Sequence, residues 1–121
     1  MILSELLEYG GIYLANLNPS RKTAPTEVSK TRPVLVMQSA ALLEVEHPST
    51  IILPLTTQVQ NNNALRFRIK AQGKLKQESD LLLDQIRAID NQRFQSLESL
   101  CVLELATMSK IFKALLELIK P

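Results

Sequence analysis

Short apolar runs separated by polar residues recur through the first half of the chain. They occupy residues 11–17 (GIYLANL), 33–38 (PVLVMQ) and 50–55 (TIILPL), and runs of this length bounded by turn-forming residues are typical of β-strands. Pro54 inside the third run predicts a strand edge or a bulge, because proline has no N–H to donate to a ladder.

The second half continues the pattern with different periods. Residues 65–69 (LRFRI) alternate strictly, which predicts a strand with Leu65, Phe67 and Ile69 toward the core and its two arginines outward. Residues 81–88 form a mainly apolar run that predicts the best-buried strand, and residues 97–103 predict a last short one.

Apolar side chains then recur at three- and four-residue spacing over residues 104–119, which predicts a C-terminal helix with one apolar face. The members of this face are Leu105, Met108, Ile111, Phe112, Leu115 and Ile119. Several short strands followed by one helix predict a single domain over residues 1–121, mainly β, in which a small antiparallel β-barrel is closed by the helix. Residues 1–9 are expected to be a short N-terminal leader without the basic region of a signal peptide.

A long polar stretch interrupts the apolar pattern at residues 20–31. Loops of about this length are uncommon in compact domains and are often functional. The stretch ends in Arg32 and Pro33, directly before an apolar run. Pro33 is expected at the first position of the strand and favours an extended conformation for Arg32, which predicts a guanidinium held at the rim of a sheet.

Charge is distributed unevenly along the chain. Residues 21–77 carry nine basic side chains against three acidic ones, a net charge of +6, which leaves −4 for the rest because the whole chain carries +2. This asymmetry favours a polyanionic partner, unless the charges lie on separate solvated faces that never converge.

Several chemistries are excluded by residue type. His47 is the only histidine and Cys101 the only cysteine, so neither a metal site nor a histidine-assisted nucleophile is expected. Three glycines, none of them in a phosphate-binding motif, argue against a nucleotide cofactor. A single cysteine suits a reducing compartment, and no apolar run approaches the roughly 18 residues of a membrane span, so we expect a cytoplasmic protein without cofactors.

The remaining chemistry uses Arg, Glu and Thr side chains. Ribonucleases can work with these, because RNA supplies its own nucleophile in the 2′-OH. Such an enzyme must remove the 2′ proton and stabilise the charge that grows on the phosphorane oxygens. The planar donor fork of arginine matches phosphate oxygens.

Four segments, in order, resemble the MazF/PemK (Kid) toxins of bacterial toxin–antitoxin systems. They are GIYLANLNP (11–19), TEVSKTRPVLVMQ (26–38), PLTTQ (54–58) and LLLDQIRAID (81–90). The resemblance implies an SH3-like or CcdB-like barrel, a homodimer, and a metal-independent endoribonuclease that cuts single-stranded RNA to 2′,3′-cyclic phosphate and 5′-OH ends. It also implies a cognate antitoxin whose acidic, partly disordered tail covers the RNA groove.

The resemblance also implies roles for individual residues. Arg32 matches the family's catalytic arginine, Thr56 its catalytic threonine, and Glu27 the acid implicated as base in some members. Because the pKa of a guanidinium is very high, we expect Arg32 to act by electrostatic stabilisation of the phosphate. The expected RNA-binding residues are Lys30, Gln38, Thr57, Gln58, Arg66 and Arg68.

The sequence departs from the family pattern in two places. Gly11 stands where the family usually has Asp, and the loop between Pro19 and Glu27 is longer and lacks its usual glycine. The longer loop leaves the RNA recognition sequence open. Two other interpretations also stay open: a non-catalytic toxin of the same fold acting on a protein such as DNA gyrase, and a binding module that has lost activity.

Overall fold

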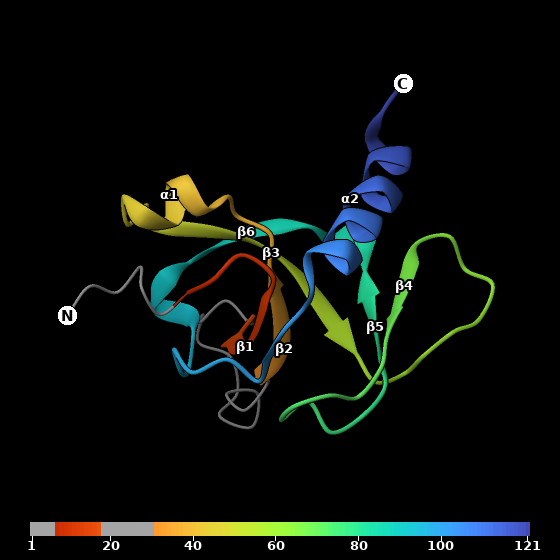
Figure 1. The fold of residues 1–121 in the computed structure, drawn as a ribbon, viewed down its shortest axis with the longest axis horizontal. Helices are drawn as coiled ribbons and strands as arrows, with labels where there is room; N and C mark the ends of the chain where they lie inside the picture. The colour runs from red at the N-terminus through yellow and green to blue at the C-terminus, as the bar shows by residue number, and fades with distance from the viewer. Residues whose placement is uncertain (1–6, 18–30) are drawn as a thin grey trace, which may run out of the picture.

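The computed structural model describes residues 7–17 and 31–121. The described elements, in chain order (Figure 1), are β1 (Gly11–Asn16), β2 (Thr31–Val36), α1 (Ala40–Glu44), β3 (Ser49–Thr56), β4 (Arg66–Ile69), β5 (Ser79–Leu82), the 3-10 turn η3 (Leu83–Gln85), β6 (Arg87–Asp90), the 3-10 turn η4 (Asn91–Arg93), β7 (Cys101–Val102) and α2 (Leu105–Ile119).

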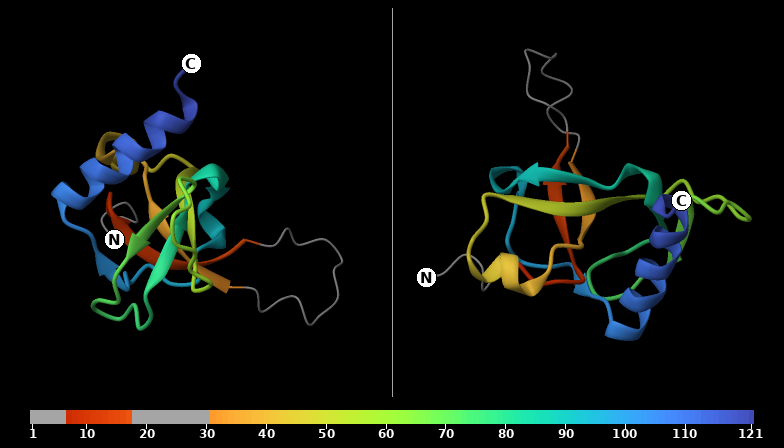
Figure 2. Two further views of the ribbon diagram at one scale, coloured as in Figure 1. Left: turned by 90° about the vertical axis from the view of Figure 1, so that its right-hand side faces the viewer. Right: turned by 90° about the horizontal axis from the view of Figure 1, so that it is seen from above.

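The strands form one strongly curled antiparallel sheet in the order β4-β5-β3-β2-β1-β7, with β6 pairing β3 beside this path. The two helices lie at opposite ends of the curled sheet (Figures 1 and 2). The prediction of a mainly β fold, a curled antiparallel sheet with a C-terminal helix, is confirmed.

Both faces of β1, β2 and β3 are buried, which explains why these strands are nearly continuous apolar runs. One cluster includes Ile12, Leu35 and Leu53 and packs against α2. The other cluster takes the alternate positions of the same strands, such as Val34 and Ile52, and packs against α1 and β6. Successive side chains of a strand point to opposite faces, so one strand supplies both clusters.

Tyr13 in the second cluster explains the departure at Gly11. The Tyr13 ring is fully buried, packs edge-on against Phe94 at 5.9 Å between ring centroids, and its hydroxyl accepts a hydrogen bond from the Glu8 N–H at 2.8 Å. A Cβ on Gly11 would lie 2.7 Å from this ring. A larger residue at position 11 therefore requires the ring to move.

Two predictions about strands are wrong. Strand β2 begins at Thr31, so Pro33 is its third residue and pairs with Leu14 of β1. The run over residues 81–88 is interrupted by η3, and much of it is exposed. The 3-10 turn separates β5 from β6 and shifts their register against β3 by three residues, whereas apolar composition alone indicated one continuous buried strand.

The predicted helix is confirmed, but its predicted single apolar face is wrong. Met108, Ile111 and Leu115 are buried against the sheet. Leu105, Phe112 and Ile119 are exposed, with 53% of Phe112 accessible. Helical spacing allowed two neighbouring apolar stripes, and only one of them meets the curled sheet. The predicted last strand over residues 97–103 is reduced to the two residues of β7.

Candidate active-site cleft

A cleft opens where β2 and β3 separate. Their last paired residues are Val34 and Pro54, after which Leu55 and Thr56 pair with β5 instead. Pro33, which has no N–H to donate, is the residue at which β2 leaves β3. The resulting cleft has a volume of about 480 Å³. It is lined by Thr31, Arg32, Pro33, Leu55, Thr56, Thr57, Gln58, Arg66, Leu82 and Gln85.

Arg32 forms one wall of this cleft. Its backbone is fixed within the β1–β2 ladder, opposite Ala15, and its side chain is exposed. No hydrogen bond or ion pair ties the Arg32 guanidinium to any residue within 7–17 or 31–121. All five N–H donors of the guanidinium are therefore open to a ligand as far as the described residues are concerned.

Thr56 lies at the floor of the cleft, where β3 ends, and is half-buried. Its Oγ accepts a hydrogen bond from the Gln58 N–H at 3.1 Å, which closes a tight turn after the strand. A hydroxyl that accepts one bond in this way keeps its own proton for donation. Thr56 can therefore donate to an anionic oxygen in the cleft.

Arg66 of β4 lines the cleft on the side away from Arg32, because β5 and β3 lie between β4 and β2 in the sheet order. Its Nη1 donates to the Gln58 carbonyl at 3.0 Å and to Asp80 Oδ2 at 3.2 Å. These two bonds hold the guanidinium in place, and 17% of the side chain remains accessible. The cleft thus has one arginine on each side, of which one is bound to the protein.

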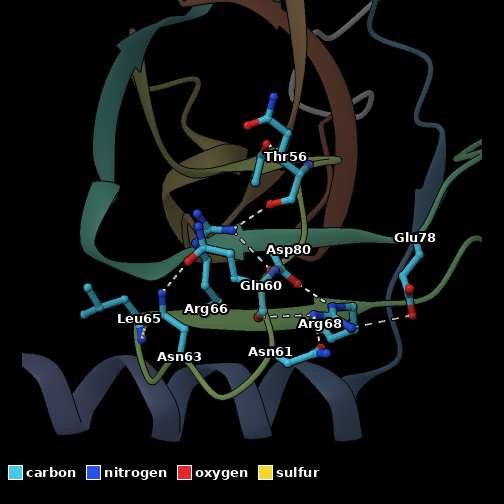
Figure 3. A network of polar contacts seen from close by, with 10 residues as sticks. Thr56, Gln60, Asn61, Asn63, Leu65, Arg66, Arg68, Glu78 and Asp80 are labelled. Carbon is cyan, nitrogen blue, oxygen red and sulfur yellow. Dashed lines mark hydrogen bonds and ion pairs between the residues drawn. The ribbon is translucent and has the colours of Figure 1, made fainter.

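Asp80 is the centre of a polar network beside the cleft (Figure 3). Its carboxylate is 1% exposed and accepts hydrogen bonds from Arg68 Nε, from Arg66 and from the Gln60 N–H. Burial alone would raise the pKa of Asp80, but the hydrogen bonds from Arg68, Gln60 and Arg66 outweigh burial and lower this pKa below its ordinary value. Asp80 is therefore ionised and fully bonded at neutral pH.

Three predicted site residues meet in the cleft with Arg32 and Thr56: Thr57, Gln58 and Arg66. Arg68 lies apart from the cleft. It is bound to Asp80 and also to Asn61 Oδ1 at 3.0 Å. The two predicted residues Glu27 and Lys30 lie outside the described residues.

The structure places Gln38 away from the cleft that brings together the predicted RNA-binding residues Thr57, Gln58 and Arg66. Gln38 follows the far end of β2 and is buried. Its amide donates to the Ser49 carbonyl at 3.0 Å and accepts from the Ile51 N–H at 3.1 Å. Gln38 therefore continues the contact between β2 and β3 where the regular ladder stops.

The sequence patterns did not single out Gln85 or Asp80 as site residues. Gln85 reaches the cleft because η3 turns the chain between two strands, and apolar periodicity carries no signal for such a turn. The signal for Asp80 was present but weak. A carboxylate beside the apolar run LLL, on the strand that follows an RFR alternation, predicts a cross-strand ion pair only once the strand pairing is known.

The part of the chain that the structure describes forms neither a metal-binding cluster nor a membrane-spanning helix. No group of three or more His, Cys, Asp or Glu side chains comes together there. Among the helices of residues 7–17 and 31–121, none has the length and apolarity to cross a bilayer. Cys101 is half-buried against the core, and burial raises the pKa of its thiol.

Comparisons with known proteins assign the chain to a family. The family described as PemK-like, MazF-like toxin of type II toxin–antitoxin system matches residues 8–119. No curated protein matches the chain.

Solved structures share the fold at low sequence identity. The Mycobacterium tuberculosis toxin MazF-mt6 is 20% identical, with a TM-score of 0.69 over 88% of this chain and 93% of that one. A MazE–MazF structure from Deinococcus radiodurans is 19% identical, with a TM-score of 0.73 over 94% and 96%. An endoribonuclease in complex with its cognate antitoxin, from a mycobacterial species, is 18% identical, with a TM-score of 0.63 over 90% and 88%.

Proposed function

The chain belongs to the PemK-like, MazF-like toxins of type II toxin–antitoxin systems, and we propose that it is a metal-independent endoribonuclease that cleaves single-stranded RNA. The observation that carries this proposal is the convergence of Arg32 and Thr56 in one open cleft, with Arg66 across from them. Two cationic walls and a hydroxyl donor suit a phosphodiester, because arginine and hydroxyl groups both donate to phosphate oxygens.

The proposed reaction needs no atom beyond the RNA and the protein. The 2′-oxygen attacks the adjacent phosphorus and loses its proton, the bond from phosphorus to the 5′-oxygen breaks, and that oxygen takes up a proton. The products are a 2′,3′-cyclic phosphate and a 5′-OH. Glu27 is the proposed base for the 2′ proton, in line with the family motif.

Arg32 is proposed to bind the scissile phosphate. Negative charge grows on the non-bridging oxygens as the phosphorane forms, and a cation beside these oxygens stabilises that charge more than it stabilises the ground state. The ladder position of Arg32 in β2 fixes its backbone before the RNA arrives. Thr56 is proposed to donate its hydroxyl proton to one of the same oxygens.

We also propose the partners that such a toxin requires. They are single-stranded RNA, a cognate antitoxin and a second copy of this chain, in the cytoplasm. Among the structures of the same fold, one is an endoribonuclease with its cognate antitoxin and another is a MazE–MazF structure. An antitoxin with an acidic tail would complement the two arginine walls of the cleft.

The test is cleavage of a long RNA by the purified protein in EDTA, with both product ends mapped. Wild type should cut at a short preferred sequence and leave 5′-OH ends, and Arg32→Ala should abolish the cuts. Lys113→Ala is the matched control, because it removes one positive charge from an exposed position of α2 and should cleave like wild type.

The outcome also separates the alternative functions. If folded wild-type protein leaves RNA intact but remains toxic, and Arg32→Ala is equally toxic, a protein target such as DNA gyrase replaces RNA as the proposed target. If neither cleavage nor toxicity is found, a binding module remains.

A further inference from the structure

A row of polar side chains crosses three strands beside the cleft. Thr56 of β3 pairs with Asp80 of β5, and Asp80 pairs with Arg68 of β4. Residues directly opposite each other in antiparallel strands point to the same face. Arg66 lies two residues from Arg68 and therefore shares this face. One buried carboxylate is thus placed between the proposed catalytic threonine and two arginines (Figure 3).

Asp80 also anchors the segment that follows β3. Its Oδ2 accepts the Gln60 N–H at 2.8 Å. The second arginine, Arg68, reaches over the same segment and donates to the Gln60 carbonyl at 3.2 Å. Asn63 adds a bond to Gln60 Oε1 at 2.9 Å. The loop between β3 and β4 is therefore fixed around a single carboxylate.

The network reaches the cleft through Arg66. One nitrogen of Arg66, Nη1, donates both to Asp80 and to the Gln58 carbonyl. Gln58 in turn donates its N–H to the Thr56 hydroxyl oxygen. Asp80 is therefore connected to Thr56 through two residues that both line the cleft.

The charge of Asp80 is unfavourable for attraction of RNA. A carboxylate within a basic wall cancels part of the positive potential that attracts a polyanion. Without it, however, Arg66 and Arg68 would repel each other and lose their fixed positions, because long side chains retain many rotamers. The position of Asp80 is therefore explained by the two arginines that its charge holds in place and not by attraction of RNA.

We propose that Asp80 is a positioning residue for RNA, which holds the Arg66 guanidinium and the segment 57–60 in the shape that receives the phosphate backbone. Asp80 itself does not touch the RNA. This inference rests on the proposed ribonuclease function. It gives a role to Arg66 and the segment 57–60, which take no part in the proposed chemical step.

The test measures how much Arg66 contributes to RNA binding with and without Asp80. The probe is a 12-nucleotide RNA that spans the mapped cleavage site and carries a 2′-deoxy sugar at the cut nucleotide, so that it binds without being cut. Arg66→Gln should weaken binding about tenfold in the otherwise wild-type protein. In the Asp80→Asn background the same change should weaken binding less than threefold, because Arg66 is no longer held.

Glu98→Gln is the matched control. It also removes one carboxylate that is paired with a cation, Lys74 at 2.7 Å, but this pair is exposed and separate from the cleft. It raises the net charge by the same amount as Asp80→Asn. Arg66→Gln should keep its full tenfold effect in this background, so a change in net charge alone is separated from a change in position.

A kinetic readout separates positioning from a purely structural role. Asp80→Asn should weaken binding of the 12-nucleotide RNA at least about threefold, because most of the Arg66 contribution is lost, while kcat changes less, because Arg32 and Thr56 form no bond to Asp80. If Asp80→Asn does not fold, Asp80→Glu takes its place. It keeps the charge but displaces the carboxylate by one methylene, and it should reduce the Arg66 contribution in the same way.

The outcomes distinguish this inference from the proposed function. If wild type binds and cleaves RNA and Arg66→Gln has the same effect with and without Asp80, the positioning role is wrong and the ribonuclease stands. If wild type neither binds nor cleaves RNA, the proposed function is wrong, and the role of Asp80 in RNA binding is wrong with it.

Discussion

The two walls of the cleft use arginine in opposite ways. Arg32 on β2 is exposed, and its guanidinium has no ion pair or hydrogen bond within the described residues. Arg66 on β4 donates to a carboxylate and to a backbone carbonyl, and its neighbour Arg68 is bound to the same carboxylate. The same residue type therefore serves as an open ligand group on one side and as a structural connector on the other.

The two arginines therefore contribute different properties to the cleft: one has free donors for a ligand, and the other has a fixed position. A guanidinium that forms no bonds in the free protein has all its donors available for a phosphate, but it loses water and rotamer freedom on binding. A guanidinium bound to a buried carboxylate gives a fixed position but has fewer free donors. A basic residue count cannot separate these two states, because the count is the same for both.

The largest expected effect is the loss of RNA cleavage when the unbound arginine, Arg32, is removed, compared with removal of the bound arginine Arg68. Arg32→Ala should lower the rate of RNA cleavage about 10³-fold, as for other losses of a charge-stabilising donor, and leave the melting temperature unchanged. Arg68→Gln removes the same charge but should lower the melting temperature and reduce cleavage far less. Cleavage rates and thermal melts of both variants test this difference. If both variants lose cleavage and thermal stability to the same extent, the two arginines do not have separate roles.

The next effect concerns stability and its pH dependence. Asp80→Asn should lower the free energy of unfolding by about 3 kcal/mol at pH 7, because two arginines lose a buried partner. The pKa of Asp80 is lower in the folded protein than its ordinary value of 3.8. Its contribution is therefore complete above about pH 5 and is lost as pH falls below 4 through the folded-state pKa.

Urea unfolding between pH 2 and pH 7 measures this contribution. Wild-type stability should fall steeply below pH 4, and the variant should show a flatter curve there. Equal slopes for wild type and Asp80→Asn would mean that Asp80 has the same proton affinity in the folded and unfolded states.

A slightly smaller effect is expected at the floor of the cleft. Thr56→Val removes the hydroxyl but keeps the branched shape, and it should lower kcat about 10²-fold. Thr56→Ser keeps the hydroxyl and should retain most of the activity. Single-turnover cleavage of a short RNA distinguishes them. Equal losses in both variants would assign Thr56 a packing role in place of a donor role.

The smallest effects on stability and cleavage are expected at Gln38 and Gln58, two glutamines that each follow a predicted strand. Gln38→Leu should lower the free energy of unfolding by about 1–2 kcal/mol, because the Ile51 N–H loses its acceptor, and should leave cleavage per folded molecule unchanged. Gln58→Leu should show the reverse, with reduced cleavage and nearly unchanged stability, since its side chain is exposed at the cleft. Denaturant melts and cleavage rates of the two variants provide the comparison.

Much of the fold could be predicted from local patterns. The strand at Gly11–Asn16 and the helix at Leu105–Ile119 followed from apolar runs and helical spacing, because the spacing of apolar residues is a local property of the chain. The interruption by η3 and the exposed stripe of α2 could not be predicted. Both depend on where the curled sheet leaves room, and apolar composition is the same for a buried and an exposed stripe.

The sequence by itself determined that an arginine stands beside a strand-forming run and that a threonine ends another. These are local facts, and the family motifs rest on them. Only the tertiary structure decided that Arg32, Thr56 and Arg66 face one cleft, that Gln38 does not, and that Asp80 binds two of the basic residues. The physical reason is strand register: partners across a ladder are distant in sequence, and only their pairing decides which charges meet.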